Sequence, residues 1–350
     1  MRYHLECSGC RAEYKSDSTF QICKKCDSLL NVVYDEKRKF AYTKDNSFWS
    51  YEEYMPDSDY RHVEAGSTGI VIAEEEGLYF KVETTNPTRS FKDRGSAIEL
   101  NKAAEYGYKE VACASTGNMA YSVSHYAKLF GMKASIFISN KANKTKEKLI
   151  RNTGSAEIHE VEGDFTDAQY AAIAYSKEND VFLAGDYCYR KEGQKTIIFE
   201  AMHDIREIDL AIIPVGNATF LAGALGALKY MKKSNAIKKM PAVFGVEAEG
   251  AKPLYAAFSS GGKIIREKPD TIADAIAVGF PTFGEECVPM LKEVRGGMIT
   301  VTDSEMREES KIFKEKYGIT AELGGVASIA AYRKLPQRGK ALAVVTGGNA

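Results

Sequence analysis

The sequence lacks an excess of either charge. Its 350 residues hold 47 lysines and arginines against 48 aspartates and glutamates, a formal net charge of -1. No strong field therefore favours nucleic acid or a membrane surface as a partner. The sequence also lacks an apolar run long enough to span a bilayer, and its first residues, "MRYHLECSGC", have no apolar core of signal-peptide length. We expect a cytoplasmic protein with neither a membrane nor a nucleic acid as partner.

The composition that is present is that of an ordinary globular protein, with 44% hydrophobic and 27% charged residues. A chain of this length predicts two domains or one large α/β unit. Neither an internal repeat nor a low-complexity tract is visible in the sequence.

Four of the seven cysteines lie together near the start of the chain. They form two C-x2-C pairs separated by "RAEYKSDSTFQI". Two such pairs can place four thiolates around one zinc ion, and a site closed by four protein ligands has no place for substrate. Two disulfides or two redox pairs are alternatives, but disulfides are rare in a reducing compartment. The sequence predicts a structural zinc ribbon over residues 1–35 with Cys7, Cys10, Cys23 and Cys26 as ligands.

The remaining cysteines, Cys113, Cys188 and Cys287, are scattered along the chain, and we expect core positions for them. The ribbon carries the basic segment "CKKC", and "EKRK" follows the ribbon; both would suit a nucleic-acid binder. The balanced charge and the absence of a concentrated basic run elsewhere weaken that alternative.

Beyond residue 60, strand-like and helix-like segments alternate along the chain. This alternation predicts parallel sheets covered by helices on both faces. In such sheets ligands bind outside the carboxyl ends of the strands. Three polar, glycine-containing loops follow apolar strands: "STGN" at 115–118, "GNAT" at 216–219 and "TGGN" at 346–349. Backbone N–H groups at such turns can bind an anion, typically a phosphate.

The stretch "NPTRSFKDRGS", residues 86–96, gathers several cations around one aromatic side chain. Neighbouring cations and a partly apolar pocket make a lysine nucleophilic, and Arg89, Arg94 and Phe91 could supply both for Lys92. An aldehyde cofactor such as pyridoxal phosphate could then condense with Lys92. A solvated helix start is the alternative interpretation of the same charges.

This stretch resembles the lysine motif of the fold-type II pyridoxal-phosphate enzymes, and its "SFKDRG" form resembles threonine synthases. Other segments resemble that family in the family's order: "STGN" its asparagine loop, "EGQKTIIFE" a threonine synthase segment, "PVGNATFLAG" the cofactor-phosphate loop and "VVTGG" the ring-nitrogen loop. An N-terminal zinc ribbon also occurs in some members. The resemblance runs from about residue 60 to the end of the chain.

The resemblance implies pyridoxal 5'-phosphate as cofactor, with zinc in the ribbon, and assigns roles to individual residues. Lys92 would hold the cofactor and act as general base, with Phe91 beside it. Asn118 would bond the ring hydroxyl, and Thr346 would meet the ring nitrogen. The cofactor phosphate would lie on the loop of Gly216, Asn217, Ala218 and Thr219. The substrate would contact Ser115, Thr116, Arg190 and Arg89.

The implied fold is α/β, of the tryptophan synthase β type, with two parallel-sheet domains. The larger domain would take residues 36–105 and 196–350. The smaller domain would take residues 106–195 and would move over the substrate. A homodimer is implied by the resemblance alone.

The implied activity is that of a lyase, a threonine synthase converting O-phospho-L-homoserine and water to L-threonine and phosphate. Cysteate synthase-like replacement on O-phosphoserine, or another lyase or dehydratase reaction on a small amino acid, remains open. A catalytically idle relative that acts in protein interaction is the non-enzyme alternative.

The departures from the threonine synthase pattern fall mainly on substrate recognition. Arg89 stands where the family usually has glycine, and Gly69 replaces the proline of a "G-x-T-P" turn. "AGDYCY", residues 184–189, replaces an "Asn-Ser-x-Asn-Pro" run, and "ELGG", residues 322–325, replaces "E-P-A-S". The expected cofactor chemistry therefore comes with a less certain substrate.

Overall fold

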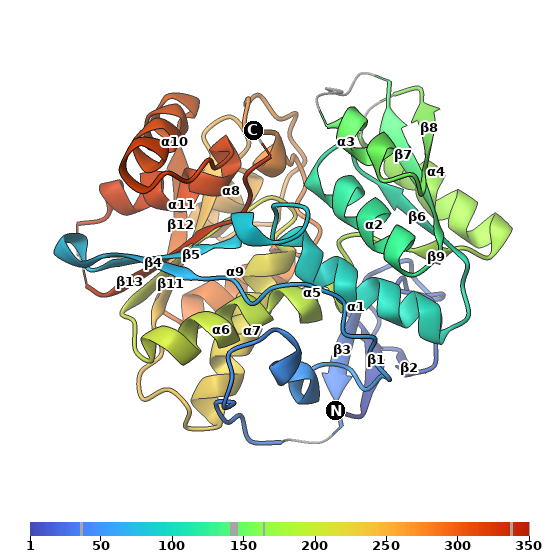
Figure 1. Ribbon diagram of the computed structural model, residues 1–350, viewed down its shortest axis with the longest axis horizontal. Coiled ribbons are helices and arrows are strands. Elements are labelled where there is room, and N and C mark those ends of the chain that lie inside the picture. Colours follow the sequence, from blue (N-terminus) through green and yellow to red (C-terminus); the bar gives the residue numbers. More distant parts are fainter. Residues whose placement is uncertain (36–37, 141–145, 164, 337–338, 350) are drawn as a thin grey trace. The chain divides into compact units, whose positions relative to one another are not determined.

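The chain divides into two compact units. The computed structural model describes residues 1–35, 38–140, 146–163, 165–336 and 339–349 (Figure 1). Unit 1 comprises Met1–Arg38, Tyr51–Ala65 and Lys92–Gly193, and unit 2 comprises Lys39–Ser50, Gly66–Phe91 and Gln194–Ala350.

The N-terminal part of unit 1 is a small antiparallel sheet of order β2-β1-β3. Its strands are β1 (Tyr3–Cys7), β2 (Glu13–Lys15) and β3 (Leu30–Tyr34). The 3-10 helix Trp49–Tyr54 begins in unit 2 and ends in unit 1.

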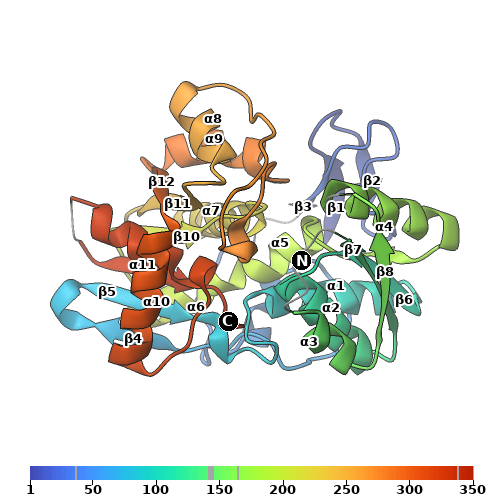
Figure 2. The same ribbon diagram turned by 90° about the horizontal axis from the view of Figure 1, so that it is seen from above.

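The rest of unit 1 is a parallel sheet of order β8-β7-β6-β9 with helices on both faces. Figure 2 shows α4 on one side of these strands and α1, α2 and α3 on the other. The strands are β6 (Glu110–Ala114), β7 (Lys133–Ser139), β8 (Ala156–Val161) and β9 (Phe182–Leu183). The helices are α1 (Lys92–Glu105), α2 (Asn118–Leu129), α3 (Glu147–Asn152), α4 (Phe165–Asn179) and α5 (Cys188–Gln194).

Helix α1 belongs to unit 1, so the chain divides at Lys92 and not after residue 105 as expected from the sequence. The reason is its packing against α2, where the Ser122 hydroxyl donates to Asp93 at 2.6 Å and to Ser96 at 2.8 Å. The expected movement of residues 106–195 stays a prediction.

Unit 2 is built on a six-stranded sheet of order β12-β11-β10-β13-β5-β4, parallel except for β4. In Figure 1, α10 and α11 lie on one side of these strands and α6 and α7 on the other. The strands are β4 (Ile70–Ala73), β5 (Leu78–Val82), β10 (Leu210–Pro214), β11 (Ala242–Ala248), β12 (Gly297–Val301) and β13 (Ala341–Val345). The helices are α6 (Thr196–Ile205), α7 (Thr219–Lys233), α8 (Pro253–Ser260), α9 (Gly284–Glu293), α10 (Asp303–Tyr317) and α11 (Leu323–Lys334).

The two central strands of this sheet are buried along their whole length. Both β10, "LAIIP", and β13, "ALAVV", have only buried residues, as expected of parallel strands with helices on both faces. The prediction of parallel sheets covered on both faces is confirmed. Along the described parts of the chain, we find no helix with the length and hydropathy needed to cross a bilayer.

A buried ion pair ties the turn at residues 66–69 to the rest of unit 2. Lys81 Nζ lies 2.7 Å from Glu200 Oε2, and both side chains are fully buried. The Glu200 carboxylate also accepts the backbone N–H groups of Ser67 and Thr68, at 3.0 and 3.2 Å. Glu200 therefore fixes the turn in which Gly69 replaces the family's proline.

Lys81→Met is expected to destabilise the protein by roughly 3 kcal/mol, because it leaves the Glu200 carboxylate buried without its cation. Urea unfolding followed by circular dichroism measures this loss. The control is Lys133→Met, which removes a cation from the surface pair with Glu157 and is expected to cost under about 1 kcal/mol. Equal losses in the two variants would contradict the prediction.

Candidate active site

Three segments of unit 2 meet at one edge of its sheet. The strands β10, β13 and β5 are neighbours and run parallel, so their carboxyl ends lie at the same edge. Residues 216–219 follow β10, residues 346–349 follow β13, and residues 83–91 follow β5 and lead to Lys92. This edge is where open parallel sheets bind ligands.

Backbone hydrogen bonds join the lysine stretch to the loop after β13. Ser90 forms an antiparallel bridge with Gly347, the Phe91 N–H donates to the Thr346 carbonyl at 2.9 Å, and the Gly348 N–H donates to the Arg89 carbonyl at 2.9 Å. Ser90 is thus a bridge residue. Lys92, the next residue after Phe91, is the first residue of α1.

Arg89 has a backbone conformation that normally belongs to glycine. Its φ is 58°, in the left-handed region that non-glycine residues rarely adopt. This explains why glycine is usual at this place in the resembling family. The Arg89 side chain is exposed, and its Nη2 atom would lie 3.1 Å from a Cβ placed on Gly348. The guanidinium is therefore beside the loop that follows β13.

The loop after β10 leads directly into α7. Ala218 has a φ of 61° and precedes Thr219, the first residue of the helix. The first-turn N–H groups of a helix point out of its end and attract an anion. The Phe91 ring lies 5.6 Å from the Phe220 ring in that first turn, so the lysine stretch packs beside this helix end.

In unit 1, the "STGN" loop follows β6 and runs into α2, whose first residue is Asn118. Ser115 and Asn118 are buried, while Thr116 is half-buried. The Ser115 hydroxyl accepts the Gly117 N–H at 3.2 Å, which shapes the turn. The expected loop at the end of an apolar strand is present.

The Lys92 amino group has a carboxylate partner in unit 1. Its Nζ donates to Asp186 Oδ1 at 3.2 Å, and the two side chains are only 17% and 6% exposed. Asp186 lies in the segment between β9 and α5. Sequence analysis did not identify this residue, although the departure of "AGDYCY" from the family pattern marks its position.

Arg190 lies in the interior of unit 1 and is fully buried. Its guanidinium pairs with the fully buried Glu99 and donates to the carbonyls of Gly185, at 2.8 Å, and Lys92, at 3.0 Å. These contacts give Arg190 a role in fixing the backbone at Lys92. The guanidinium is thus engaged inside unit 1. The predicted contact of Arg190 with the substrate stays a prediction.

The predicted residues fall in two groups. Lys92, Ser115, Thr116, Asn118 and Arg190 belong to unit 1. Unit 2 holds the others: Arg89, Phe91, Gly216, Asn217, Ala218, Thr219 and Thr346. The Thr346 side chain is buried at the sheet edge, and Asn217 Oδ1 accepts the Thr282 hydroxyl at 3.2 Å.

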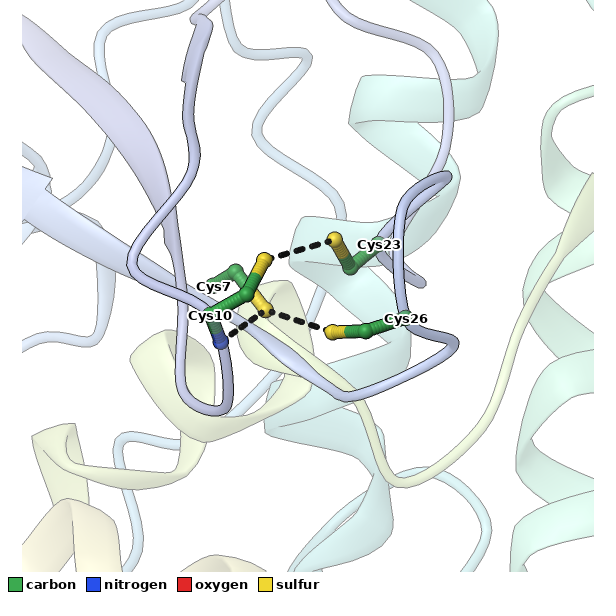
Figure 3. A group of neighbouring side chains, drawn as sticks. All are labelled: Cys7, Cys10, Cys23 and Cys26. Atoms are coloured by element: carbon green, nitrogen blue, oxygen red, sulfur yellow. Dashed lines mark hydrogen bonds between the residues drawn. The ribbon is translucent and has the colours of Figure 1, made fainter.

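The four N-terminal cysteines converge on one point (Figure 3). All four Sγ atoms lie within 4.8 Å of one another, with Cys7 and Cys26 3.4 Å apart and Cys10 and Cys23 3.6 Å apart. Tetrahedral zinc with bonds of about 2.3 Å requires sulfur–sulfur distances of about 3.8 Å. The cluster therefore fits a single zinc ion, whereas the cysteines are free of disulfides.

The other three cysteines are buried, as expected. Burial raises the pKa of both Cys113 and Cys188 to about 12, so neither is a thiolate at neutral pH. Cys287 lies in α9 with its Sγ 3.8 Å from the Ala218 carbonyl.

Residues 67–347 match the profile of a family described as "Pyridoxal-phosphate dependent enzyme". The chain belongs to this pyridoxal-phosphate dependent family. It is 33% identical to a threonine synthase from Methanosarcina acetivorans, over 96% of this chain and 88% of that protein. It is 32% identical to a threonine synthase from Methanocaldococcus jannaschii, over 95% of this chain and 87% of that protein.

The fold agrees with this family. A solved structure of maize serine racemase superimposes with a TM-score of 0.71, at 23% identity, covering 81% of this chain and 88% of that one. The prediction of a fold-type II pyridoxal-phosphate enzyme with a cysteine cluster suited to a zinc ribbon is confirmed. The protein is a pyridoxal-phosphate dependent lyase.

Proposed function

We propose that the protein is a threonine synthase, which converts O-phospho-L-homoserine and water to L-threonine and phosphate. The observation that carries the proposal is the 33% identity to a threonine synthase across 96% of the chain. The cofactor family and the resemblance of the Lys92 motif to that of threonine synthases support it.

The residues around this edge fit pyridoxal phosphate. The first turn of α7 and the loop 216–219 suit its phosphate, since a helix N-terminus and turn amides bind anions. The buried Thr346 hydroxyl suits the ring nitrogen, and Phe91 packs between Thr346 and the α7 helix end. We assign the ring hydroxyl to Asn118 at the start of α2. When bound, the cofactor supplies a sink for the electron pair left on the substrate's α-carbon.

Lys92 is the proposed general base. Its amino group can take the proton from the substrate's α-carbon and return a proton later, as phosphate leaves the γ-carbon and water adds at the β-carbon. Ser115 and Thr116, in the turn after β6, are the proposed partners of the substrate carboxylate. The exposed Arg89 guanidinium is a candidate for the substrate phosphate, because a guanidinium fork matches phosphate bidentately.

We further propose that Cys7, Cys10, Cys23 and Cys26 hold a structural zinc ion. A homodimer, a cytoplasmic location and closure of residues 106–195 over the substrate stay predictions.

A second candidate is β-replacement on O-phosphoserine with sulfite. The exposed Arg89 beside Gly348 favours it, because an extra fixed cation at this edge would suit a second anion. O-phosphohomoserine and O-phosphoserine give different products, so one experiment separates the two candidate functions.

The test is an absorption spectrum of the purified protein with O-phosphohomoserine and then with O-phosphoserine, with phosphate release measured in parallel. A shifted cofactor band, phosphate release and threonine with O-phosphohomoserine would support the proposal. A response to O-phosphoserine alone would favour the second candidate. A protein with no cofactor band would instead be the idle relative.

A further inference from the structure

Lys92 is held at both its backbone and its side chain by one short segment. Residues 184–190 comprise the connection after β9 and the first residues of α5, and this segment contributes two charged side chains. The Arg190 Nη1 atom donates to the Lys92 carbonyl at 3.0 Å, and Asp186 Oδ1 accepts the Lys92 amino group at 3.2 Å. All of these residues belong to unit 1.

The segment is itself fixed by buried polar contacts. Glu99 Oε1 accepts the Gly185 N–H at 3.0 Å, and Arg190 Nε donates to the Gly185 carbonyl at 2.8 Å. Arg190 also donates to the Ser96 hydroxyl at 3.1 Å. Because Gly185 precedes Asp186, the Glu99–Arg190 pair determines where the Asp186 carboxylate stands. A Cβ on Gly95 would lie 2.4 Å from Arg190 Cγ, so there is no room for this side chain to shift toward α1.

A carboxylate next to an amine has a definite chemical effect. It accepts a charge-assisted hydrogen bond from the ammonium form and stabilises that form over the free amine. Among the described residues, the ionisable groups close to Lys92 and Asp186 include Glu99 on α1, Arg190 on α5, Cys113 on β6 and Tyr187. Burial raises the pKa of Cys113 to about 12, so this thiol carries no charge that could replace Asp186.

We propose that Asp186 is the counter-ion of Lys92. This inference rests on the proposed role of Lys92 as the cofactor lysine. When Lys92 takes the proton from the substrate's α-carbon, the C–H bond breaks and leaves its electron pair on that carbon, while the lone pair of Nζ forms the new N–H bond. The carboxylate of Asp186 stays ionised throughout and accepts a hydrogen bond from the ammonium. Asp186 thereby orients the amino group and keeps the proton on Nζ until Lys92 returns it to the substrate.

The first test uses the cofactor-free protein and does not depend on turnover. Lysines are labelled briefly with acetic anhydride, and the Lys92 peptide is quantified by mass spectrometry against Lys311, whose side chain is 76% exposed. Asp186→Asn keeps the shape and the acceptor but removes the charge. We expect Lys92 of this variant to be labelled about tenfold faster than wild type at neutral pH, because the neutral amide no longer holds the amino group in a charge-assisted hydrogen bond. At strongly alkaline pH, where that charge-assisted hydrogen bond is lost in both proteins, the rates should converge.

The matched control is Asp180→Asn, which removes an exposed carboxylate from the same region of unit 1. It should leave Lys92 labelling unchanged. Equal labelling of Lys92 in wild type and Asp186→Asn at neutral pH would overturn the proposal. So would a rate difference that persists at alkaline pH, since this would reflect accessibility alone. Circular dichroism verifies that both variants are folded.

A second measurement separates this inference from the proposed function. Borohydride reduction of the cofactor-loaded wild type, followed by peptide mapping, shows whether the cofactor is on Lys92. If it is elsewhere, the proposed function fails, whereas the labelling result for Asp186 stands by itself. If it is on Lys92, we expect Asp186→Asn to change kcat and move its pH profile while KM changes little. An unchanged kcat profile would remove the catalytic part of the inference.

Discussion

Replacing Lys92 by alanine is expected to remove covalent attachment of pyridoxal phosphate and to lower turnover at least about 1,000-fold. The physical reason is that Lys92 would serve as both the covalent anchor and the general base, and general acid–base catalysis alone contributes about 100- to 10,000-fold. The measurements are the visible absorption band, mass spectrometry of the borohydride-reduced protein and phosphate release from O-phosphohomoserine.

Lys92→Arg is the matched variant for this prediction. It keeps a cation that can pair with Asp186, 3.2 Å away in the wild type, but a guanidinium cannot replace the amine as a nucleophile. We therefore expect it to be as inactive as Lys92→Ala and to unfold at nearly the wild-type temperature. An active Lys92→Arg enzyme, or a reduced cofactor adduct on another lysine, would refute the assignment of Lys92.

The carboxyl edge of the unit 2 sheet could be predicted from the sequence. The apolar runs at 210–216 and 341–348 each end in a small polar turn, and the structure places β10 and β13 there as neighbouring parallel strands. The apolar composition of a buried parallel strand is visible in a few neighbouring residues, and so is the glycine at which such a strand ends. The order of motifs then indicated the family correctly.

The environment of Lys92 could not be predicted in the same way. Its contacts with Asp186 and Arg190 join residues 94 and 98 positions apart in the chain. Such contacts depend on how β9 and α1 meet, which no local pattern encodes. The family resemblance alone assigned Arg190 to the substrate, and no local pattern indicated its buried pair with Glu99.

Some elements had local signals that sequence analysis did not use. Thr302 and Glu305 form a capping box at the start of α10, with the Glu305 N–H 3.2 Å from the Thr302 hydroxyl. The pattern of threonine followed three residues later by glutamate predicts this helix start. In contrast, the sequence of residues 192–205 is consistent with one continuous helix, but the structure divides these residues between α5 and α6. The helical pattern alone contains no sign of that break.

The ribbon also contacts the segment that holds Lys92. The Tyr3 hydroxyl lies 3.1 Å from the Tyr189 hydroxyl, and Lys191 Nζ donates to Asn31 at 2.6 Å. Tyr34 donates to Glu192, and Gln21 donates to the Leu183 carbonyl. These contacts lie on both sides of Asp186 and Arg190 in the sequence. The ribbon therefore stabilises β9 and α5, the two elements that flank Asp186, through contacts within unit 1.

Removing the proposed zinc ion is expected to unfold the ribbon and loosen that segment. Structural zinc sites contribute roughly 10 kcal/mol or more to the folding of isolated zinc-finger peptides, so four unligated thiols should not keep β1, β2 and β3 in place. The variant is Cys23→Ser/Cys26→Ser, which removes one C-x2-C pair. We expect loss of bound zinc by elemental analysis, faster deuterium exchange over residues 183–192 and a kcat lowered about tenfold or more, since a small displacement at a catalytic group is costly.

The control is Cys287→Ala, which removes a buried thiol from α9 in unit 2 and leaves the four ribbon cysteines intact. It should retain zinc and wild-type exchange over residues 183–192. A wild-type protein without zinc would refute the metal assignment, and unchanged exchange in the zinc-free variant would refute the coupling. Because the described contacts between the ribbon and the segment are made by side chains such as Tyr3, Gln21, Asn31 and Tyr34, a coupled result would mean that the metal acts on Lys92 by keeping these side chains in place.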